Sequence, residues 1–148
     1  LPKWKIYGFD SFEGLPEQWE SCKSGTFSLN GNEPSVHEDI ILIKGWFNET
    51  LPLWVQNNPE SPPIKLLHVD CDLYSSTKTI FNIIGHLITN QTVIVFDEFL
   101  HYHGYENHEM LAFYEFLLKY QYEFHIIACG GDNTEKLALV CSASDIMY

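Results

Sequence analysis

The sequence predicts an α/β fold built on a mostly parallel β-sheet. Apolar, strand-like runs alternate with segments whose apolar residues recur at helical spacing, and this alternation is typical of parallel strands joined by crossover helices. Several of the runs are apolar throughout, as expected for strands that are covered on both faces. The last two runs have no helix between them, which predicts an antiparallel hairpin at the C-terminal end of the chain.

The N-terminal third is expected to form two strands, a long loop and a helix. Residues 5–9 are an aromatic and β-branched run that predicts a strand ending at Asp10. Residues 21–34 are rich in Ser, Gly and Asn and predict a long surface loop, which in a compact domain is often functional. The run 39–44 predicts a strand buried on both faces, and 48–57 predicts a short helix with a proline near its first turn.

The middle of the chain predicts a strand, a helix and a further strand. Residues 64–69 follow a proline-rich loop and form an apolar run. Ser75 or Ser76 is suited to cap a helix, because apolar residues recur at helical spacing from there to Ile88. Residues 92–96 then predict a second buried strand.

The C-terminal part predicts a helix over 106–120 and a hairpin formed by 123–128 and 136–141, with a turn-rich link between them. The chain of 148 residues is long enough for one domain with a sizeable core, and it contains no internal repeat. We therefore expect a single domain over residues 1–148.

Composition limits the classes of partner. Acidic residues outnumber basic ones by 20 to 8, which gives a net charge of -12, so nucleic acids and anionic membranes would be repelled. Small molecules, cations and neutral glycans fit better, and a homo-oligomer is compatible with the sequence. The sequence contains no run of about 18 apolar residues, so no membrane span is predicted. The cysteines have no CxxC spacing, which favours free thiols and a cytoplasmic protein; they are Cys22, Cys71, Cys129 and Cys141.

Two acidic pairs follow neighbouring strand-like runs. Asp70 and Asp72 come after the run 64–69, and Asp97 and Glu98 come after the run 92–96. Ligands of open α/β sheets bind outside the carboxyl ends of the strands, so these carboxylates are expected to share a site. Together they suit a hard divalent cation such as Mg²⁺. The alternative is that they are solvated strand ends and helix caps.

Other residues have weaker signals. Asp10, after the first strand, is placed to accept hydrogen bonds from a ribose diol or to cap a loop. Trp46 and Phe47 are suited to stack on a planar ring or to close a core. Zinc is a minor alternative for three histidines that lack a cysteine partner and an HExxH pattern: His101, His103 and His108. The sequence contains no glycine-rich nucleotide-binding motif and no GxSxG motif.

Four segments in order resemble the macrocin-type O-methyltransferases: residues 8–16, 44–52, 68–77 and 95–99. The resemblance spans nearly the whole chain. It implies a Rossmann-like class I methyltransferase sheet, S-adenosylmethionine as methyl donor, Mg²⁺ dependence and a hydroxyl acceptor on a sugar, as in macrolides and novobiocin.

The resemblance also implies roles for individual residues. By position, Asp70, Asp97 and Glu98 are similar to the metal ligands, and Asp72 is similar to the general base. Glu98 departs from the family, which more often has Asp at this position. The residues that resemble the cofactor-binding positions are Asp10, Ser11, Gly45 and Trp46.

The family's first strand and its glycine-rich loop would lie before Leu1. We therefore expect the chain to be an N-terminally truncated, partial methyltransferase domain that by itself binds S-adenosylmethionine weakly or not at all.

Three further hypotheses remain at the level of the sequence. A metal-dependent glycosyltransferase would use Asp70 and Asp72 as an Asp-x-Asp motif, but that leaves Asp97 and Glu98 unexplained. A phosphatase with Asp70 as nucleophile fits less well, because its motif usually lies near the start of a domain. A non-catalytic domain derived from a methyltransferase is the third.

Overall fold

The computed structural model describes residues 4–132 and 134–143. The chain forms two compact units, one ending at Asn57 and one beginning at Asn58.

The N-terminal unit contains two parallel strands and one helix, as the sequence predicts: β1 (Ile6–Asp10), β2 (Ile40–Lys44) and α1 (Phe47–Asn57). The strands pair in register from Ile6 opposite Ile40 to Asp10 opposite Lys44. Trp54 of α1 packs edge-on against two aromatic rings of β1. No helix or strand is assigned between Asp10 and Ile40, which confirms the predicted loop.

The prediction that β2 is covered on both faces is wrong for the described chain. Ile41 in the middle of the strand is 45% exposed. Within its unit, β2 pairs with β1, and α1 is the one described helix, so the two-stranded sheet lacks a second covering layer.

The C-terminal unit contains a four-stranded sheet in the order β3-β4-β6-β5. β3 and β4 are parallel, whereas β6 pairs antiparallel with both β4 and β5. The predicted parallel strands and C-terminal hairpin are therefore confirmed. The strands are β3 (Leu66–Val69), β4 (Val93–Phe96), β5 (Tyr122–Gly130) and β6 (Lys136–Ala143).

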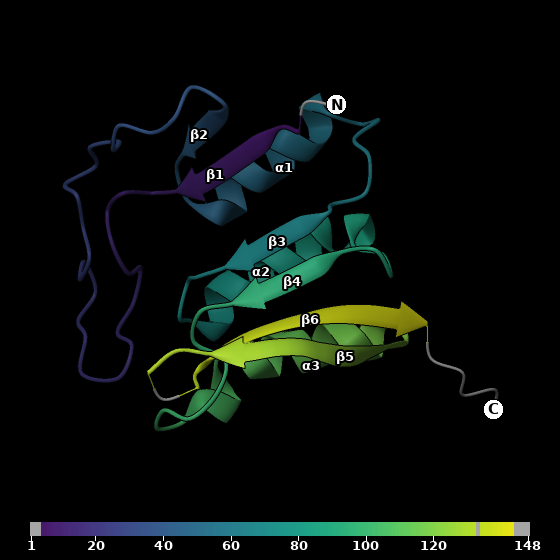
Figure 1. Ribbon diagram of the computed structural model, residues 1–148. Coiled ribbons are helices and arrows are strands. Elements are labelled where there is room, and N and C mark those ends of the chain that lie inside the picture. The colour runs from purple at the N-terminus through teal and green to yellow at the C-terminus, as the bar shows by residue number, and fades with distance from the viewer. Residues whose placement is uncertain (1–3, 133, 144–148) are drawn as a thin grey trace. The chain divides into compact units, whose positions relative to one another are not determined.

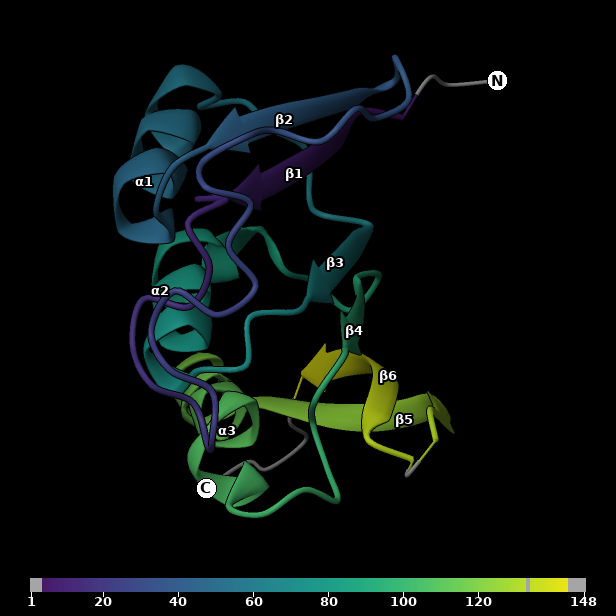
Figure 2. The same ribbon diagram turned by 90° about the vertical axis from the view of Figure 1, so that its left-hand side faces the viewer.

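Both helices of this unit lie on the same face of its sheet, as Figures 1 and 2 show together. They are α2 (Tyr74–Ile84) and α3 (Glu109–Tyr120), and short 3₁₀ turns follow α2 and precede α3, at Gly85–Leu87 and Tyr105–Asn107. Among the described residues, no helix is long and apolar enough to cross a membrane.

The boundaries of α2 differ from the prediction. Leu73 is the N-cap residue and makes no side-chain cap hydrogen bond, so the prediction that Ser75 or Ser76 caps the helix is wrong. Thr77 determines this start, because its backbone N–H and its hydroxyl both donate to the carbonyl of Leu73. The helix also ends at Ile84, before the predicted residue.

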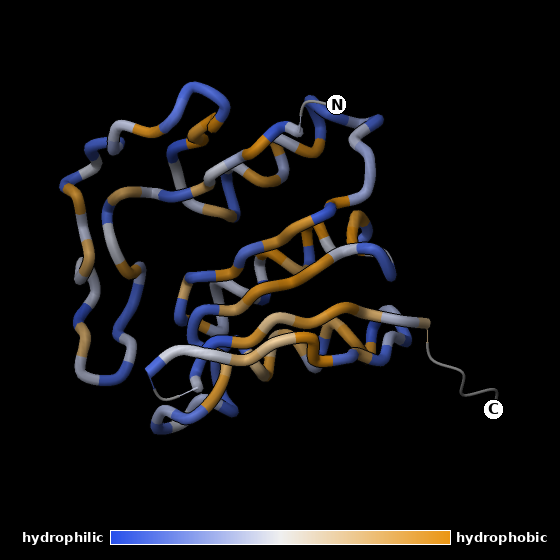
Figure 3. Tube along the Cα trace, viewed as in Figure 1, coloured by the Kyte–Doolittle hydropathy of each residue, from blue (hydrophilic) through white to orange (hydrophobic). Residues whose placement is uncertain are grey.

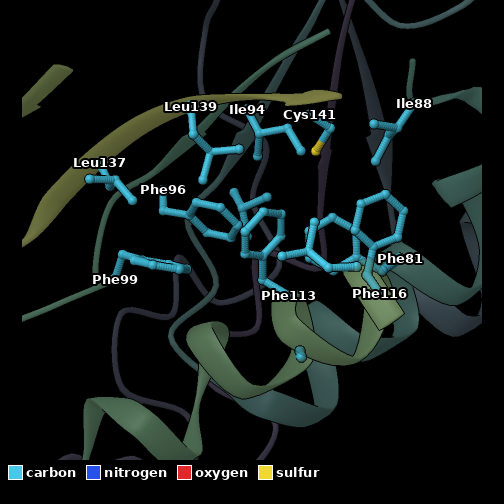
Figure 4. Close-up of a cluster of buried hydrophobic side chains, with 13 residues drawn as sticks. Phe81, Ile88, Ile94, Phe96, Phe99, Phe113, Phe116, Leu137, Leu139 and Cys141 are labelled. Carbon is cyan, nitrogen blue, oxygen red and sulfur yellow. The ribbon is translucent and has the colours of Figure 1, made fainter. Parts of the chain in front are cut away.

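The core of the C-terminal unit lies between its sheet and the two helices. Figure 4 shows Phe113 and Phe116 of α3 directed toward the buried side chains of the sheet. Phe113 is fully buried and its ring contacts those of Phe81, Phe96 and Phe99. The hydropathy colouring of Figure 3 shows the apolar stretch along β4 that supplies part of this core. This packing fixes the positions at which β3 and β4 end.

Candidate active site

The predicted acidic pairs meet at the carboxyl ends of β3 and β4. The two strands are parallel neighbours, with Val69 opposite Phe96 in the last pair. The backbone N–H of Asp97 donates to the carbonyl of Val69 at 3.0 Å, which continues the pairing by one step. Asp70 and Asp97 therefore leave the same edge of the sheet side by side.

The carboxylates form two overlapping groups of metal-ligating atoms. Asp70, Asp72 and Glu98 each offer one oxygen, and these atoms all lie within 4.8 Å of one another. His68, Asp70 and Asp97 form a second group within the same limit. Asp70 belongs to both, so the structure brings together the four acidic residues that the sequence selected but divides them between two centres.

Asp72 and Glu98 are held in an environment that opposes ionisation. Burial, and then the negative charge of Asp70, raise the pKa of Asp72 to about 6, although a hydrogen bond with Glu98 acts in the opposite direction. Burial, followed by the charges of Asp97, Asp72 and Asp70, raises the pKa of Glu98 to about 8. Such crowding of like charges is relieved by a bound cation.

One oxygen of the group has no hydrogen-bond partner in the described part of the chain. Glu98 Oε2 is buried without a hydrogen-bond partner among the described residues. Carboxylate oxygens are the donors that Mg²⁺ prefers, and Mg²⁺ keeps several waters, so two or three protein carboxylates suffice. The donor set of Asp70, Asp72 and Glu98 therefore fits a divalent cation.

Asp97 has a different electrostatic environment. Burial alone would raise its pKa, but a hydrogen bond and ion pair with Lys136 lower the pKa below its ordinary value, and Glu98 and His68 contribute in the same direction. His68 Nε2 lies 3.9 Å from Asp97 Oδ1. Asp97 is thus paired with the ammonium group of Lys136 on β6.

The backbone at Asp72 is in an uncommon conformation. Its φ is 60°, in the left-handed region, and the N–H of Leu73 donates across it to the carbonyl of Cys71 at 2.5 Å. This is a γ-turn of the rarer, strained form. Strained backbone of this kind persists only where neighbouring groups hold it, and it clusters at functional sites.

Sequence reasoning missed Glu109, which lies beneath this turn. The residue is the first of α3 and is fully buried. Its Oε1 accepts a hydrogen bond from the N–H of Cys71 at 3.3 Å. The two residues are 38 positions apart, and no local pattern marks Glu109 as part of the site.

The predicted cofactor-binding residues lie in the N-terminal unit, at the ends of β1 and β2. The N–H of Gly45 donates to the carbonyl of Asp10 at 2.9 Å. One carboxylate oxygen of Asp10 accepts the N–H of Phe12, and Ser11 Oγ accepts the N–H of Glu13. Asp10 and Ser11 thus stabilise the turn after β1, and Trp46 is half-buried. The role of Asp10, Ser11, Gly45 and Trp46 in cofactor binding remains a prediction.

The zinc alternative receives no support from the described residues. Neither group of ligating atoms in that part of the chain includes His101, His103 or His108. His101 Nδ1 instead lies 2.7 Å from the hydroxyl of Thr134. All four cysteines are free, as predicted.

Three solved structures are similar to this chain. The crystal structure of CalS11, a calicheamicin methyltransferase, has 22% identity and a TM-score of 0.66, over 92% of this chain and 60% of that chain. The apo structure of CalS11, described as a TDP-rhamnose 3'-O-methyltransferase, has 23% identity and a TM-score of 0.60, over 92% and 58%. The O-methyltransferase NovP has 18% identity and a TM-score of 0.63, over 95% and 60%.

At these identities the likeness concerns the fold, and it confirms the predicted α/β class. The chain spans about 60% of the length of CalS11 and NovP. A comparison with curated protein sequences finds no match. Residues 3–99, more than half of the chain, match a family described as a methyltransferase domain. The chain therefore belongs to this methyltransferase-domain family, as the resemblance in its four motifs implied.

Proposed function

We propose that the chain is part of an S-adenosylmethionine-dependent O-methyltransferase that acts, with the help of Mg²⁺, on a hydroxyl of a sugar or a glycosylated small molecule. Membership of the methyltransferase-domain family supports the reaction class. The printed descriptions of CalS11 and NovP, one of them a TDP-rhamnose 3'-O-methyltransferase, support the acceptor class. The observation that carries the proposal is the group formed by Asp70, Asp72 and Glu98 at the carboxyl end of the parallel strands.

The cation ligands in this proposal are Asp70 and Glu98, with Asp97 as the third ligand that the resemblance implies. Asp70 belongs to both groups of ligating atoms, and Glu98 offers a buried oxygen without a protein partner among the described residues. A bound Mg²⁺ would supply positive charge that stabilises the oxygen of an ionising hydroxyl. Asp97 would have to exchange its ion pair with Lys136 for that ligand role.

Asp72 is the general base of the proposal. The residue is 8% exposed and its carboxyl has a pKa of about 6, so at neutral pH it is mostly ionised and can accept a proton. Bound S-adenosylmethionine would supply its methyl group to the acceptor oxygen, and the electron pair of the carbon–sulfur bond would leave with the sulfur. The hydroxyl proton goes to Asp72. The strained turn fixes the direction from which this carboxylate approaches the acceptor.

The N-terminal unit would supply contacts to the nucleoside part of the methyl donor. Asp10 is exposed at the end of β1, and one of its oxygens is engaged in the turn. Its carboxylate is of the type that accepts hydrogen bonds from a ribose diol. Ser11 directly follows β1, and Gly45 and Trp46 directly follow β2, which is the basis for including them.

Methyl transfer to TDP-sugars tests the proposal. A protein that joins this chain to the family's first strand and glycine-rich loop is incubated with S-adenosylmethionine, Mg²⁺ and a panel of TDP-deoxysugars, and methylated sugar is measured by mass spectrometry. We expect product that depends on Mg²⁺ and is abolished by EDTA, and that is lost in Asp72→Asn but retained in Glu38→Gln, which changes an exposed acid of the N-terminal unit. Release of free sugar from a UDP-sugar without methyl transfer would instead favour the glycosyltransferase alternative.

A further inference from the structure

The turn that carries Asp70 and Asp72 is attached to α3 through one buried side chain. Oε1 of Glu109 lies 3.3 Å from the backbone nitrogen of Cys71 and 3.8 Å from its sulfur, and accepts from both. Cys71 is the residue between the two aspartates. A hydrogen bond to the N–H of Cys71 therefore restrains the backbone between Asp70 and Asp72.

Within residues 4–132 and 134–143, the side chain of Glu109 makes hydrogen bonds only with Cys71. The residue has no exposed surface, and its Oε2 has no hydrogen-bond partner among the described residues. A buried, incompletely satisfied acid is costly, because the desolvation of a polar group is offset only by hydrogen bonds. A hydrophobic residue would pack at the start of α3 without this cost. The carboxyl group at this position therefore suggests a role in binding Cys71.

The environment of this carboxyl group favours its neutral form. Burial raises the pKa of Glu109 well above its ordinary value, and the negative charges of Asp72, Glu98 and Asp70 add to this, although the hydrogen bond from Cys71 acts against it. A neutral acid adds no further negative charge to the cluster. It contributes an oriented acceptor, which a glutamine side chain of the same length also provides.

The strained γ-turn needs such an acceptor. With φ of Asp72 at 60° and the bond from Leu73 N–H to Cys71 carbonyl closing the turn, the segment stores strain that its neighbours must hold. Thr77 restrains the C-terminal end of the turn by donating a hydrogen bond to the carbonyl of Leu73, and its hydroxyl lies 3.2 Å from the sulfur of Cys71. Glu109 restrains the N-terminal end of the turn by accepting a hydrogen bond from the N–H of Cys71.

We propose that Glu109 is a positioning residue that fixes the Cys71–Leu73 turn from α3 and thereby sets the directions of the carboxylates of Asp70 and Asp72. The role of these two carboxylates rests on the proposed function, but the positioning itself does not. The start of α3 would thereby act on the site through Cys71.

Two substitutions of similar size separate positioning from charge. Glu109→Gln keeps the side-chain length and the acceptor but cannot ionise. Glu109→Asp keeps the acid but is shorter by one methylene, so its oxygen falls short of Cys71 N–H. A positioning role ranks Gln above Asp, whereas a charge role ranks Asp above Gln. The matched controls are Glu115→Gln and Glu115→Asp, because Glu115 is also on α3 and bonds Tyr74 and Lys78 instead.

The first measurement is amide hydrogen exchange by NMR, which needs no ligand. Loss of one hydrogen bond to a buried acceptor corresponds to about tenfold faster opening. We expect the Cys71 amide to exchange about tenfold faster in Glu109→Asp and at the wild-type rate in Glu109→Gln. Amides of β4 that pair with β6 should exchange at wild-type rates in both variants, which shows that the unit remains folded.

The second measurement is the affinity for Mn²⁺ by electron paramagnetic resonance. We expect about tenfold weaker binding in Glu109→Asp and wild-type binding in Glu109→Gln and in both Glu115 variants. If wild-type protein binds no Mn²⁺ while the Cys71 amide still responds as described, the cation site of the proposed function fails and the positioning role stands. Wild-type exchange of the Cys71 amide in Glu109→Asp, or faster exchange in Glu109→Gln than in Glu109→Asp, would overturn the inference.

Discussion

Cation binding by this chain should depend steeply on pH because of Glu98. Its pKa of about 8 means that it is about 1% ionised at pH 6 and about half ionised at pH 8. A cation that takes Glu98 as a ligand must displace this proton. The apparent dissociation constant should therefore lie about 100-fold above its limiting value at pH 6 and about twofold above it at pH 8, a change of about 50-fold.

Asp72 adds little to this change. With a pKa of about 6 it is half protonated at pH 6 and almost fully ionised at pH 8, so it contributes at most about a further twofold. The variant Glu98→Gln should therefore bind the cation more weakly at pH 8 and lose nearly all of the pH dependence. Glu115→Gln, a change on α3 outside the cluster, should keep the wild-type profile.

Titration with Mn²⁺ at about pH 6, 7 and 8, with the free ion measured by electron paramagnetic resonance, is a suitable assay. The reasoning is refuted if the dissociation constant of wild-type protein changes less than about threefold over this range, because a site that contains Glu98 cannot avoid the proton. Equal pH dependence in wild type and Glu98→Gln would refute it as well.

The same carboxyls affect stability without a cation. The folded-state pKa of Glu98 lies above its ordinary value of 4.5, so the native state holds a proton that the unfolded chain releases. This contribution is complete below about pH 4.5 and is lost as the pH rises through about 8. We expect the melting temperature of the metal-free chain to fall between about pH 6 and pH 9, as measured by circular dichroism, and saturating Mg²⁺ to oppose the fall. A rise of the melting temperature over this range would contradict the environment assigned to Glu98.

The remaining predictions concern single residues. In a protein that joins this chain to the family's first strand and glycine-rich loop, Asp72→Asn should lower the rate of methyl transfer by about 100- to 10,000-fold without loss of folding, measured as initial rates by mass spectrometry, and an unchanged rate would exclude Asp72 as the base. Phe113→Ala should reduce the free energy of unfolding by about 3–5 kcal/mol in urea titrations, because its buried ring contacts much of the core. Leu118→Ala on the same helix, at a side chain that is 79% exposed, should change it by less than about 0.5 kcal/mol. Gly14→Ala should destabilise the N-terminal unit in thermal melts, because Gly14 has φ +79° and a Cβ there would lie 2.2 Å from the carbonyl of Thr26.

The sequence was informative about the sheet because its strands are short apolar runs with clear ends. The runs that became β3 and β4 are each followed directly by acidic pairs, and parallel pairing brings their ends to one edge, so the position of the site followed from local patterns. The burial of β2 could not be predicted from the sequence, because the exposure of Ile41 depends on which layers cover the strand and not on the residues of the strand itself. The start of α2 was missed because Thr77 inside the helix, rather than a serine cap, holds its first turn.

The residues that contact the acidic cluster from β6 and α3 could not be predicted from local sequence patterns. Lys136 and Glu109 meet the acidic cluster only through tertiary packing of β6 and α3, and neither stands in a recognisable motif. His68 was within reach, because it lies two residues before Asp70 and side chains at this spacing point to the same face of a strand. His68 joins Asp70 and Asp97 in one group of ligating atoms and Lys136 pairs with Asp97, so the sequence alone, which considered neither residue, predicted one shared site.

The position of a bound cation tests the central claim most directly. Crystals of the protein soaked with Mn²⁺ would be measured for anomalous scattering from the ion. The account predicts one strong anomalous peak within coordination distance of Asp70 and Glu98, next to Asp72. A peak held by His68 and Asp97 without Glu98, or no peak at saturating Mn²⁺, would contradict it.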